Sequence, residues 1–160
     1  MRKYVTLVIV VAVLVIIDQV TKYWAVTSMS PGSIISITSF FNLTLVYNTG
    51  GAFGFLSQVD EVVRMAVFVA AVIVIIVCMV YFFAHYYRKS FWASLCISMI
   101  IGGAMGNLID RVRLRKVVDF LDLHAADYHW PAFNFADICV TVGIALFIIY
   151  ILFEGVSRKH

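Results

Sequence analysis

Long apolar stretches dominate this sequence, and they restrict the chain to folds that lie within a membrane. A spanning helix needs about 20 mostly apolar residues, and three stretches, 4–26, 65–84 and 91–109, meet that requirement readily. A fourth, 135–153, meets it if Asp137 is accepted near its outer end. Every backbone polar group in lipid must bond internally, which helices achieve. We therefore expect an all-α membrane protein with four transmembrane helices.

Composition supports lipid as the main solvent of a single domain, residues 1–160. The chain is 63% hydrophobic and 13% charged. A soluble domain of this size could not bury so much apolar surface. A net charge of +3 from scattered basic residues gives no reason to expect a nucleic acid partner. The three cysteines all fall inside apolar stretches and are expected to pack as small hydrophobes: Cys78, Cys96 and Cys139.

The first apolar stretch resembles a secretory signal peptide because basic residues precede it. No small-x-small cleavage site follows it, and polar residues interrupt its outer end: Asp18, Gln19 and Lys22. We expect it to be a retained membrane anchor.

The distribution of charge around the spans favours one orientation. Basic residues divide evenly between the two faces, so the positive-inside rule does not decide. The basic short loop and basic tails still favour both termini in the cytoplasm. All acids except Glu154 then lie toward the outer face, so any chemistry is expected there: Asp18, Asp60, Glu61, Asp110, Asp119, Asp122, Asp127 and Asp137.

The segments 27–62 and 110–134 are expected to be extracytoplasmic. Apolar and polar residues nearly alternate over 35–47, which predicts a half-buried strand. The sequence Asn48-Thr49-Gly50-Gly51 then predicts a turn. A second short strand is predicted over 117–123. A small β-sheet on the membrane surface would follow.

Polar residues within or beside the spans are costly and usually mark function. Asp18 and Lys22 lie one helical turn apart, which an orienting ion pair alone would explain. Asn107 and Asp110 share a helix face at i,i+3, and Arg111 is placed to pair with a nearby carboxylate. For this group a scaffold role is favoured over chemistry, because an aspartate beside an arginine stays ionised.

Asp119 and Asp137 are the candidate catalytic residues. Asn134 is the expected N-cap of the fourth helix, which places Asp137 in its first turn. Taken singly, Asp137 could serve the helix dipole, and Asp119 could pair with Arg111 or Arg115. Together at one membrane face they suggest a carboxylate pair that shares one proton. The ionised member would activate water, and the protonated member would donate to the peptide carbonyl oxygen.

Other hydrolytic chemistries lack parts in this sequence. It has no HExxH motif for a zinc protease and no GxSxG-type serine elbow. His124 and His129, near Asp122 and Asp127, have no diagnostic metal-ligand spacing and are interpreted as surface polar residues. No metal or cofactor is expected. Small residues at spacing four indicate close helix packing: Gly102, Gly103 and Gly106.

Five blocks in order resemble the lipoprotein signal peptidase, or signal peptidase II, family over nearly the whole chain. They are DQVTK (18–22), NTGGAFGF (48–55), GNLIDR (106–111), VVDF (117–120) and FNFAD (133–137). One departure is visible, because Gly51 stands where the family usually has the first alanine of NxGAAF. That change loosens a turn and touches no catalytic position.

The resemblance implies a specific activity. It makes Asp119 and Asp137 a catalytic dyad that cuts prolipoproteins just before their diacylglyceryl-modified cysteine, in the bacterial inner membrane and without a metal. Membrane lipid and prolipoproteins are the expected partners, and a monomer is expected. Phe53 to Phe55 could cover the acyl chains or the peptide. The residues expected to bind substrate or support the site are Asp18, Lys22, Asn48, Gly50, Asn107, Asp110, Arg111, Asn134 and Ala136.

Two other functions remain open on the residues alone. Asp18 and Asp137 are of the kind found in the proton relay of a small transporter, although the acids cluster at one face. The outer arginines would suit a lipid-binding scaffold.

Overall fold

The computed structural model describes residues 2–50, 60–87 and 90–157. Its four long helices are α1 (Arg2–Ser28), α2 (Glu61–Phe82), α3 (Phe91–Leu114) and α4 (Phe135–Ser157), and a short π-helical turn, η2 (Phe83–Tyr87), continues α2. Each of the four long helices is long and apolar enough to cross a membrane. The prediction of four membrane helices is therefore confirmed.

Side chains fix where two of these helices begin. The Asp60 carboxylate accepts hydrogen bonds from the Val62 and Val63 amides at the start of α2, and the Ser90 hydroxyl accepts one from Ala93 at the start of α3. These caps satisfy amides that have no partner inside the helix. Helix α3 ends at Arg115, whose φ of 58° is left-handed. Residues 110–114, which were predicted to lie beyond the third span, form the last turn of α3.

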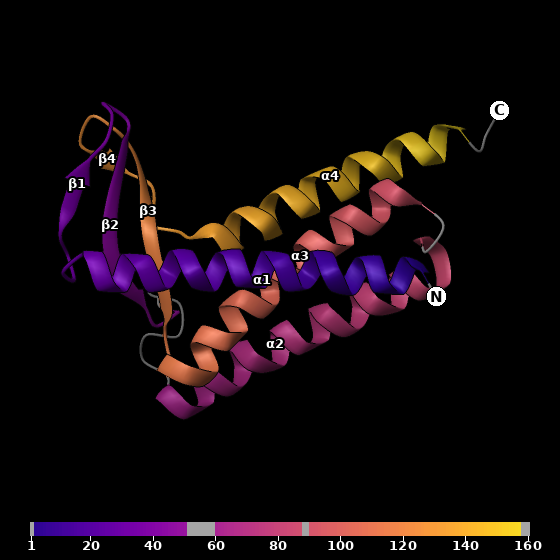
Figure 1. Ribbon diagram of the computed structural model, residues 1–160, viewed down its shortest axis with the longest axis horizontal. Coiled ribbons are helices and arrows are strands. Elements are labelled where there is room, and N and C mark those ends of the chain that lie inside the picture. The colour runs from indigo at the N-terminus through magenta and orange to yellow at the C-terminus, as the bar shows by residue number, and fades with distance from the viewer. Residues whose placement is uncertain (1, 51–59, 88–89, 158–160) are drawn as a thin grey trace.

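Helix α3 lies at the centre of the bundle and packs against the other three helices (Figure 1). Glycines permit its close approach to two of them. A Cβ on Gly103 would collide with the Ala136 carbonyl of α4, and one on Gly106 would collide with the Asp18 carboxylate of α1. The helices α1, α2 and α4 expose large apolar side chains outward, such as Ile16, Val77 and Phe153, which suits a lipid surrounding.

A four-stranded antiparallel sheet caps one end of the bundle, while the start of α1 and the end of α4 lie at the other end (Figure 1). The strands β1 (Ile34–Ser36), β2 (Phe41–Asn48), β3 (Val117–Ala125) and β4 (Tyr128–His129) pair in that order. The register places Val46 opposite Asp119. Leu45, Val118 and Phe120 of the sheet form a buried cluster with Ala25 and Met29 at the end of α1.

The prediction of one strand over 35–47 was wrong in one respect. The chain reverses between β1 and β2, where the Thr38 hydroxyl accepts a hydrogen bond from the Phe40 amide and the amides of Ile37 and Thr38 both donate to the Phe41 carbonyl. Ser39 and Phe40 interrupt the alternation at this turn, but it resumes in the same register at Phe41, so the two strands read as one. The strand predicted over 117–123 and the small sheet are confirmed, and β4 was not foreseen.

Candidate active site

Asp119, on β3, and Asp137, in the first turn of α4, are joined through one residue, Asn134, which bonds to both. Asp119 lies in the middle of β3 and is almost fully buried, whereas Asp137 is half-buried. The sequence separates them by a loop and a two-residue strand. The fold places both at the sheet end of the bundle, as expected.

Asn134 contacts both aspartates. Its side-chain Nδ2 donates to Asp119 Oδ1 at 2.6 Å, and its backbone amide donates to Asp137 Oδ2 at 3.1 Å. Its Oδ1 accepts the Asp137 amide at 3.0 Å. This reciprocal pair of bonds is a capping box, so the prediction that Asn134 caps α4 is confirmed. The cap also fixes the two carboxylates relative to each other.

Two further asparagines hold one aspartate each. Asn48 Nδ2 donates to Asp119 Oδ2 at 3.0 Å, and its own Oδ1 accepts the Gly50 amide at 2.8 Å. Gly50 has a φ of +86°, a conformation that side chains disfavour. Asn107 Nδ2 donates to Asp137 Oδ1 at 2.8 Å. Each carboxylate therefore accepts two amide donors.

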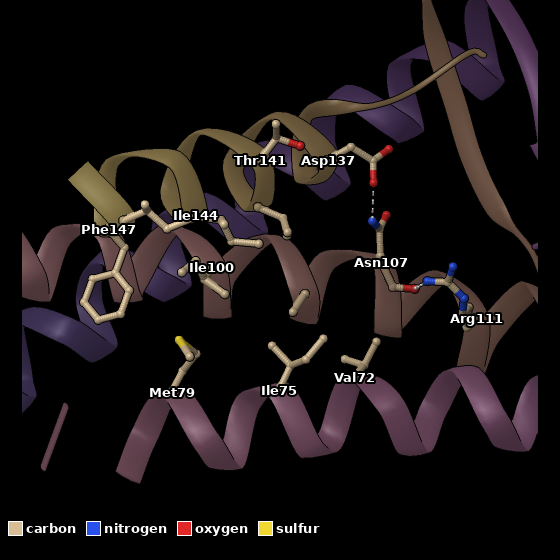
Figure 2. Close-up of a pocket in the computed structure, with 13 residues that line it drawn as sticks. Val72, Ile75, Met79, Ile100, Asn107, Arg111, Asp137, Thr141, Ile144 and Phe147 are labelled. Carbon is tan, nitrogen blue, oxygen red and sulfur yellow. Dashed lines mark hydrogen bonds between the residues drawn. The ribbon is translucent and has the colours of Figure 1, made fainter. Parts of the chain in front are cut away.

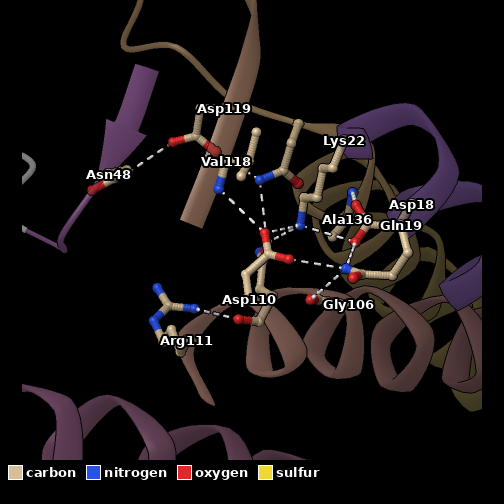
Figure 3. Close-up of polar contacts among 12 residues, drawn as sticks. Asp18, Gln19, Lys22, Asn48, Gly106, Asp110, Arg111, Val118, Asp119 and Ala136 are labelled. Atoms are coloured by element: carbon tan, nitrogen blue, oxygen red, sulfur yellow. Dashed lines mark hydrogen bonds and ion pairs between the residues drawn. The ribbon is translucent and has the colours of Figure 1, made fainter. Parts of the chain in front are cut away.

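A buried cation lies behind these asparagines. Lys22 Nζ is 2.9 Å from both Asp18 Oδ2 and Asp110 Oδ2, and it donates to Asn107 Oδ1 at 3.0 Å (Figure 3). The expected pairing of Asp18 with Lys22 is confirmed, and Asp110 is a second partner. Asn107 thus joins the ion pairs to Asp137.

The two acids of this cluster also accept hydrogen bonds from backbone amides of the elements that carry Asp119 and Asp137. Asp18 accepts the Ala136 amide at 3.0 Å, next to Asp137. Asp110 accepts the Val118 amide at 3.2 Å, next to Asp119. Sequence reasoning missed Gln19, whose Nε2 bonds to Asp18, Asp110 and the Gly106 carbonyl. The sequence signal that could have identified Gln19 is its place beside Asp18 in an otherwise apolar helix.

Arg111 and Arg115 do not form the ion pairs considered for Asp119. Arg115 lies 3.6 Å from Glu61 on the surface. The guanidinium of Arg111 lies over the Phe68 ring, 5.0 Å from its centroid, and donates weakly to the Asn107 carbonyl at 3.5 Å. Arg111 therefore faces the site without a direct contact to either aspartate, and amides take the place of the expected cation.

The pKa of Asp119 is raised to about 6, chiefly by burial and also by the nearby charge of Asp137. The hydrogen bonds from Asn48 and Asn134, and the charge of Lys22, oppose this rise because they favour the carboxylate. Burial is the largest of these effects. Asp119 therefore exchanges its proton close to neutral pH, as a general acid does.

Two apolar cavities converge on Asp137. The interhelix cavity, about 430 Å³, lies between α2, α3 and α4, and Asn107, Arg111 and Asp137 are its polar lining near the sheet (Figure 2). The hairpin cavity, about 330 Å³, lies between α4 and the β3–β4 hairpin and includes Trp130 and Phe133. Both are open to the surroundings of the helices. An apolar ligand in either cavity would lie against Asp137.

His124 and His129 lie outside this site. Their rings stack with centroids 5.1 Å apart, and His129 Nδ1 is 2.9 Å from Asp122. In residues 2–50, 60–87 and 90–157, no group of three or more His, Cys, Asp or Glu side chains is arranged to hold a metal ion. Gly51 and the segment 53–55 lie outside the described residues.

Comparisons with known proteins agree on one family. A family model described as signal peptidase (SPase) II matches residues 10–153. A protein named lipoprotein signal peptidase from Burkholderia mallei (strain SAVP1) is 40% identical over 136 residues, which cover 85% of this chain and 81% of that protein. One from Janthinobacterium sp. (strain Marseille) is 41% identical over 140 residues, covering 87% and 83%.

Two solved structures share the fold. Both are described as bacterial membrane enzyme structures determined by the in meso method. One, at 1.9 Å resolution, has a TM-score of 0.82 and 38% identity, and the match covers 92% of each chain. The other, at 2.3 Å resolution, has a TM-score of 0.83 and 37% identity, and covers 97% of this chain and 92% of that one.

Proposed function

Because the chain belongs to the signal peptidase II family, we propose that it cleaves diacylglyceryl-modified prolipoproteins just before the lipidated cysteine, with Asp119 and Asp137 as an aspartyl dyad. The observation that carries this proposal is the set of bonds from Asn134 to both carboxylates. Two carboxylates held by one buried residue compete for one proton. A shared proton is what aspartyl catalysis of peptide hydrolysis requires.

The two aspartates take different roles in this mechanism. Asp119, with its pKa raised to about 6, holds the proton and donates it to the scissile carbonyl oxygen. Asp137 is the half-buried member and lines both cavities, so it removes a proton from the attacking water. The tetrahedral intermediate then breaks down as the leaving amine receives a proton from the dyad.

The cavities suit a substrate that arrives through lipid. Their linings are apolar apart from the groups near Asp137, so signal peptide and acyl chains would pack there while the scissile bond meets the carboxylates. Proton transport is disfavoured because the acids of the spans gather at the sheet end. We place that end at the outer face of the membrane.

The test replaces each aspartate separately in the purified full chain. Asp119→Asn and Asp137→Asn should each reduce cleavage of a lipid-modified precursor by at least about 10³-fold, because the dyad acts as a unit. Asp122→Asn is the matched control, since Asp122 lies on the same strand, equally buried, and bonds to Asn42 and His129. Retained activity in either dyad variant, with a melting temperature near wild type, would refute the assignment.

A further inference from the structure

Thr141 carries an unpaired hydroxyl beside the candidate dyad. It lies one helical turn beyond Asp137 on α4 and lines both the interhelix cavity and the hairpin cavity. Figure 2 shows its hydroxyl on the side that faces Asp137. Thr141 Oγ1 makes no hydrogen bond to any residue that the structure describes.

Two other hydroxyls in the spanning helices behave differently. Thr27 Oγ1 donates to the Tyr23 carbonyl at 2.9 Å, and Ser98 Oγ donates to the Ser94 carbonyl at 2.7 Å. This bond to the preceding turn is the usual way for a helix to satisfy a hydroxyl in an apolar setting. Thr141 Oγ1 makes no such bond to a residue that the structure describes. An unpaired hydroxyl in hydrocarbon is unfavourable, so a ligand that accepts its hydrogen bond is favoured there.

The surroundings restrict what the acceptor is. The charged groups that line the interhelix cavity, Arg111 and Asp137, lie toward the sheet, whereas Ile144 and Phe147 continue the lining beyond Thr141 (Figure 2). The acceptor therefore lies between a polar reacting centre and hydrocarbon. A neutral carbonyl oxygen suits that position, because Ile144 and Phe147, which line the cavity there, carry no charge that could offset a buried anion.

The ester carbonyls of a diacylglyceryl group have this chemistry and this placement. They lie a few bonds from the cysteine that follows the scissile bond, and they join it to the acyl chains. Side chains at i and i+4 on a helix are about 5–6 Å apart. A substrate with its scissile bond at Asp137 would therefore bring an ester carbonyl within reach of Thr141.

We infer that Thr141 Oγ1 donates a hydrogen bond to an ester carbonyl of the substrate's diacylglyceryl group and so helps to select the lipid-modified precursor. This inference rests on the proposed function. It assigns Thr141 to substrate binding and leaves the chemistry to the dyad.

The experiment uses the purified full chain and two precursors with one peptide sequence. One carries the diacylglyceryl group, and the other carries a dialkylglyceryl group, whose ether links keep the chains and remove the carbonyls. Thr141→Val should raise KM for the ester precursor about three- to tenfold and leave kcat near wild type, as the loss of one hydrogen bond in a membrane protein predicts. Wild type should show a similar KM increase with the ether precursor, and Thr141→Val should add nothing to it.

Two further variants control for packing. Thr141→Ser keeps the hydroxyl and should retain the wild-type KM. Thr27→Val makes the same chemical change where the hydroxyl already bonds to Tyr23, and it should alter neither parameter. An unchanged KM in Thr141→Val, or an equal increase with both precursors, would overturn this inference alone. Failure of wild type to cleave either precursor would overturn the proposed function, and this inference with it.

Discussion

At the scale of single residues, the partners of the two aspartates are amides. Asn48, Asn107 and Asn134 supply the side-chain donors, and the nearest buried cation, Lys22, is held by Asp18 and Asp110. A cation bonded directly to the pair would favour ionisation of both members. Neutral donors orient the carboxylates, and although they oppose the rise in the pKa of Asp119, burial is the larger effect.

The pH dependence of cleavage follows from Asp119. If Asp119 is the acid, it works while protonated, so kcat/KM should fall as pH rises through its pKa of about 6. Asn48→Ala removes a donor that favours the carboxylate, so the pKa of Asp119 should rise and the alkaline fall should move to higher pH. The maximal rate should drop about ten- to hundredfold, because the acid is less well positioned.

Asn42→Ala is the matched control for that pH profile. Asn42 makes the equivalent bond between β2 and β3, with its Nδ2 3.0 Å from Asp122 Oδ2. Its loss should leave the pH profile of kcat/KM in place. A profile that moves equally in both variants would show that the sheet as a whole, and not Asn48, sets the protonation of Asp119.

At the scale of elements, the ion pairs of Lys22 join the parts that carry the dyad. Lys22 and Asp18 come from α1 and Asp110 comes from α3. Asp18 then bonds to the start of α4, and Asp110 bonds to the start of β3. The helices and the sheet thus meet at one buried cluster, so its integrity should govern stability as well as activity.

Lys22→Met should destabilise the chain strongly. It leaves Asp18 and Asp110 buried without their cation, which costs about 3–5 kcal/mol. Arg115→Gln breaks the exposed pair with Glu61 and should cost less than about 1 kcal/mol. Unfolding in detergent, followed by circular dichroism, compares the two. Equal stability of the two variants would mean that the buried cluster contributes little.

Some of these elements were readable from the sequence and others were not. The spans depend on continuous apolar stretches, and the Asp18–Lys22 pair and the Asn134 cap depend on neighbours within one helical turn; the structure confirms all three. The turn at Thr38 was not predicted because the alternation resumes in the same register after a break at Ser39 and Phe40. The bonds from Lys22 to Asp110 and from Asn134 to Asp119 depend on tertiary packing, which spacing along a chain does not reveal.

At the scale of the whole molecule, the polar parts are segregated. The sheet and the candidate dyad occupy one end of the bundle, and the start of α1 and the end of α4 occupy the other. The distribution of basic residues does not determine whether the sheet end faces outward or toward the cytoplasm. The proposed substrate favours one orientation, because a peptidase that acts on exported lipoproteins needs its dyad at the outer face.

We therefore predict that the turn between β3 and β4 faces outward and that η2 faces the cytoplasm. In a variant whose three cysteines are replaced, Asp127→Cys should react with a membrane-impermeant maleimide in intact spheroplasts, because Asp127 is exposed at the sheet end. His85→Cys, equally exposed in η2 at the opposite end, should react after the membrane is opened. Replacing the cysteines matters because Cys78 is exposed on α2 and would add background. The reverse labelling pattern would place Asp119 and Asp137 on the cytoplasmic side, where a dyad would have no access to a precursor anchored in the outer leaflet.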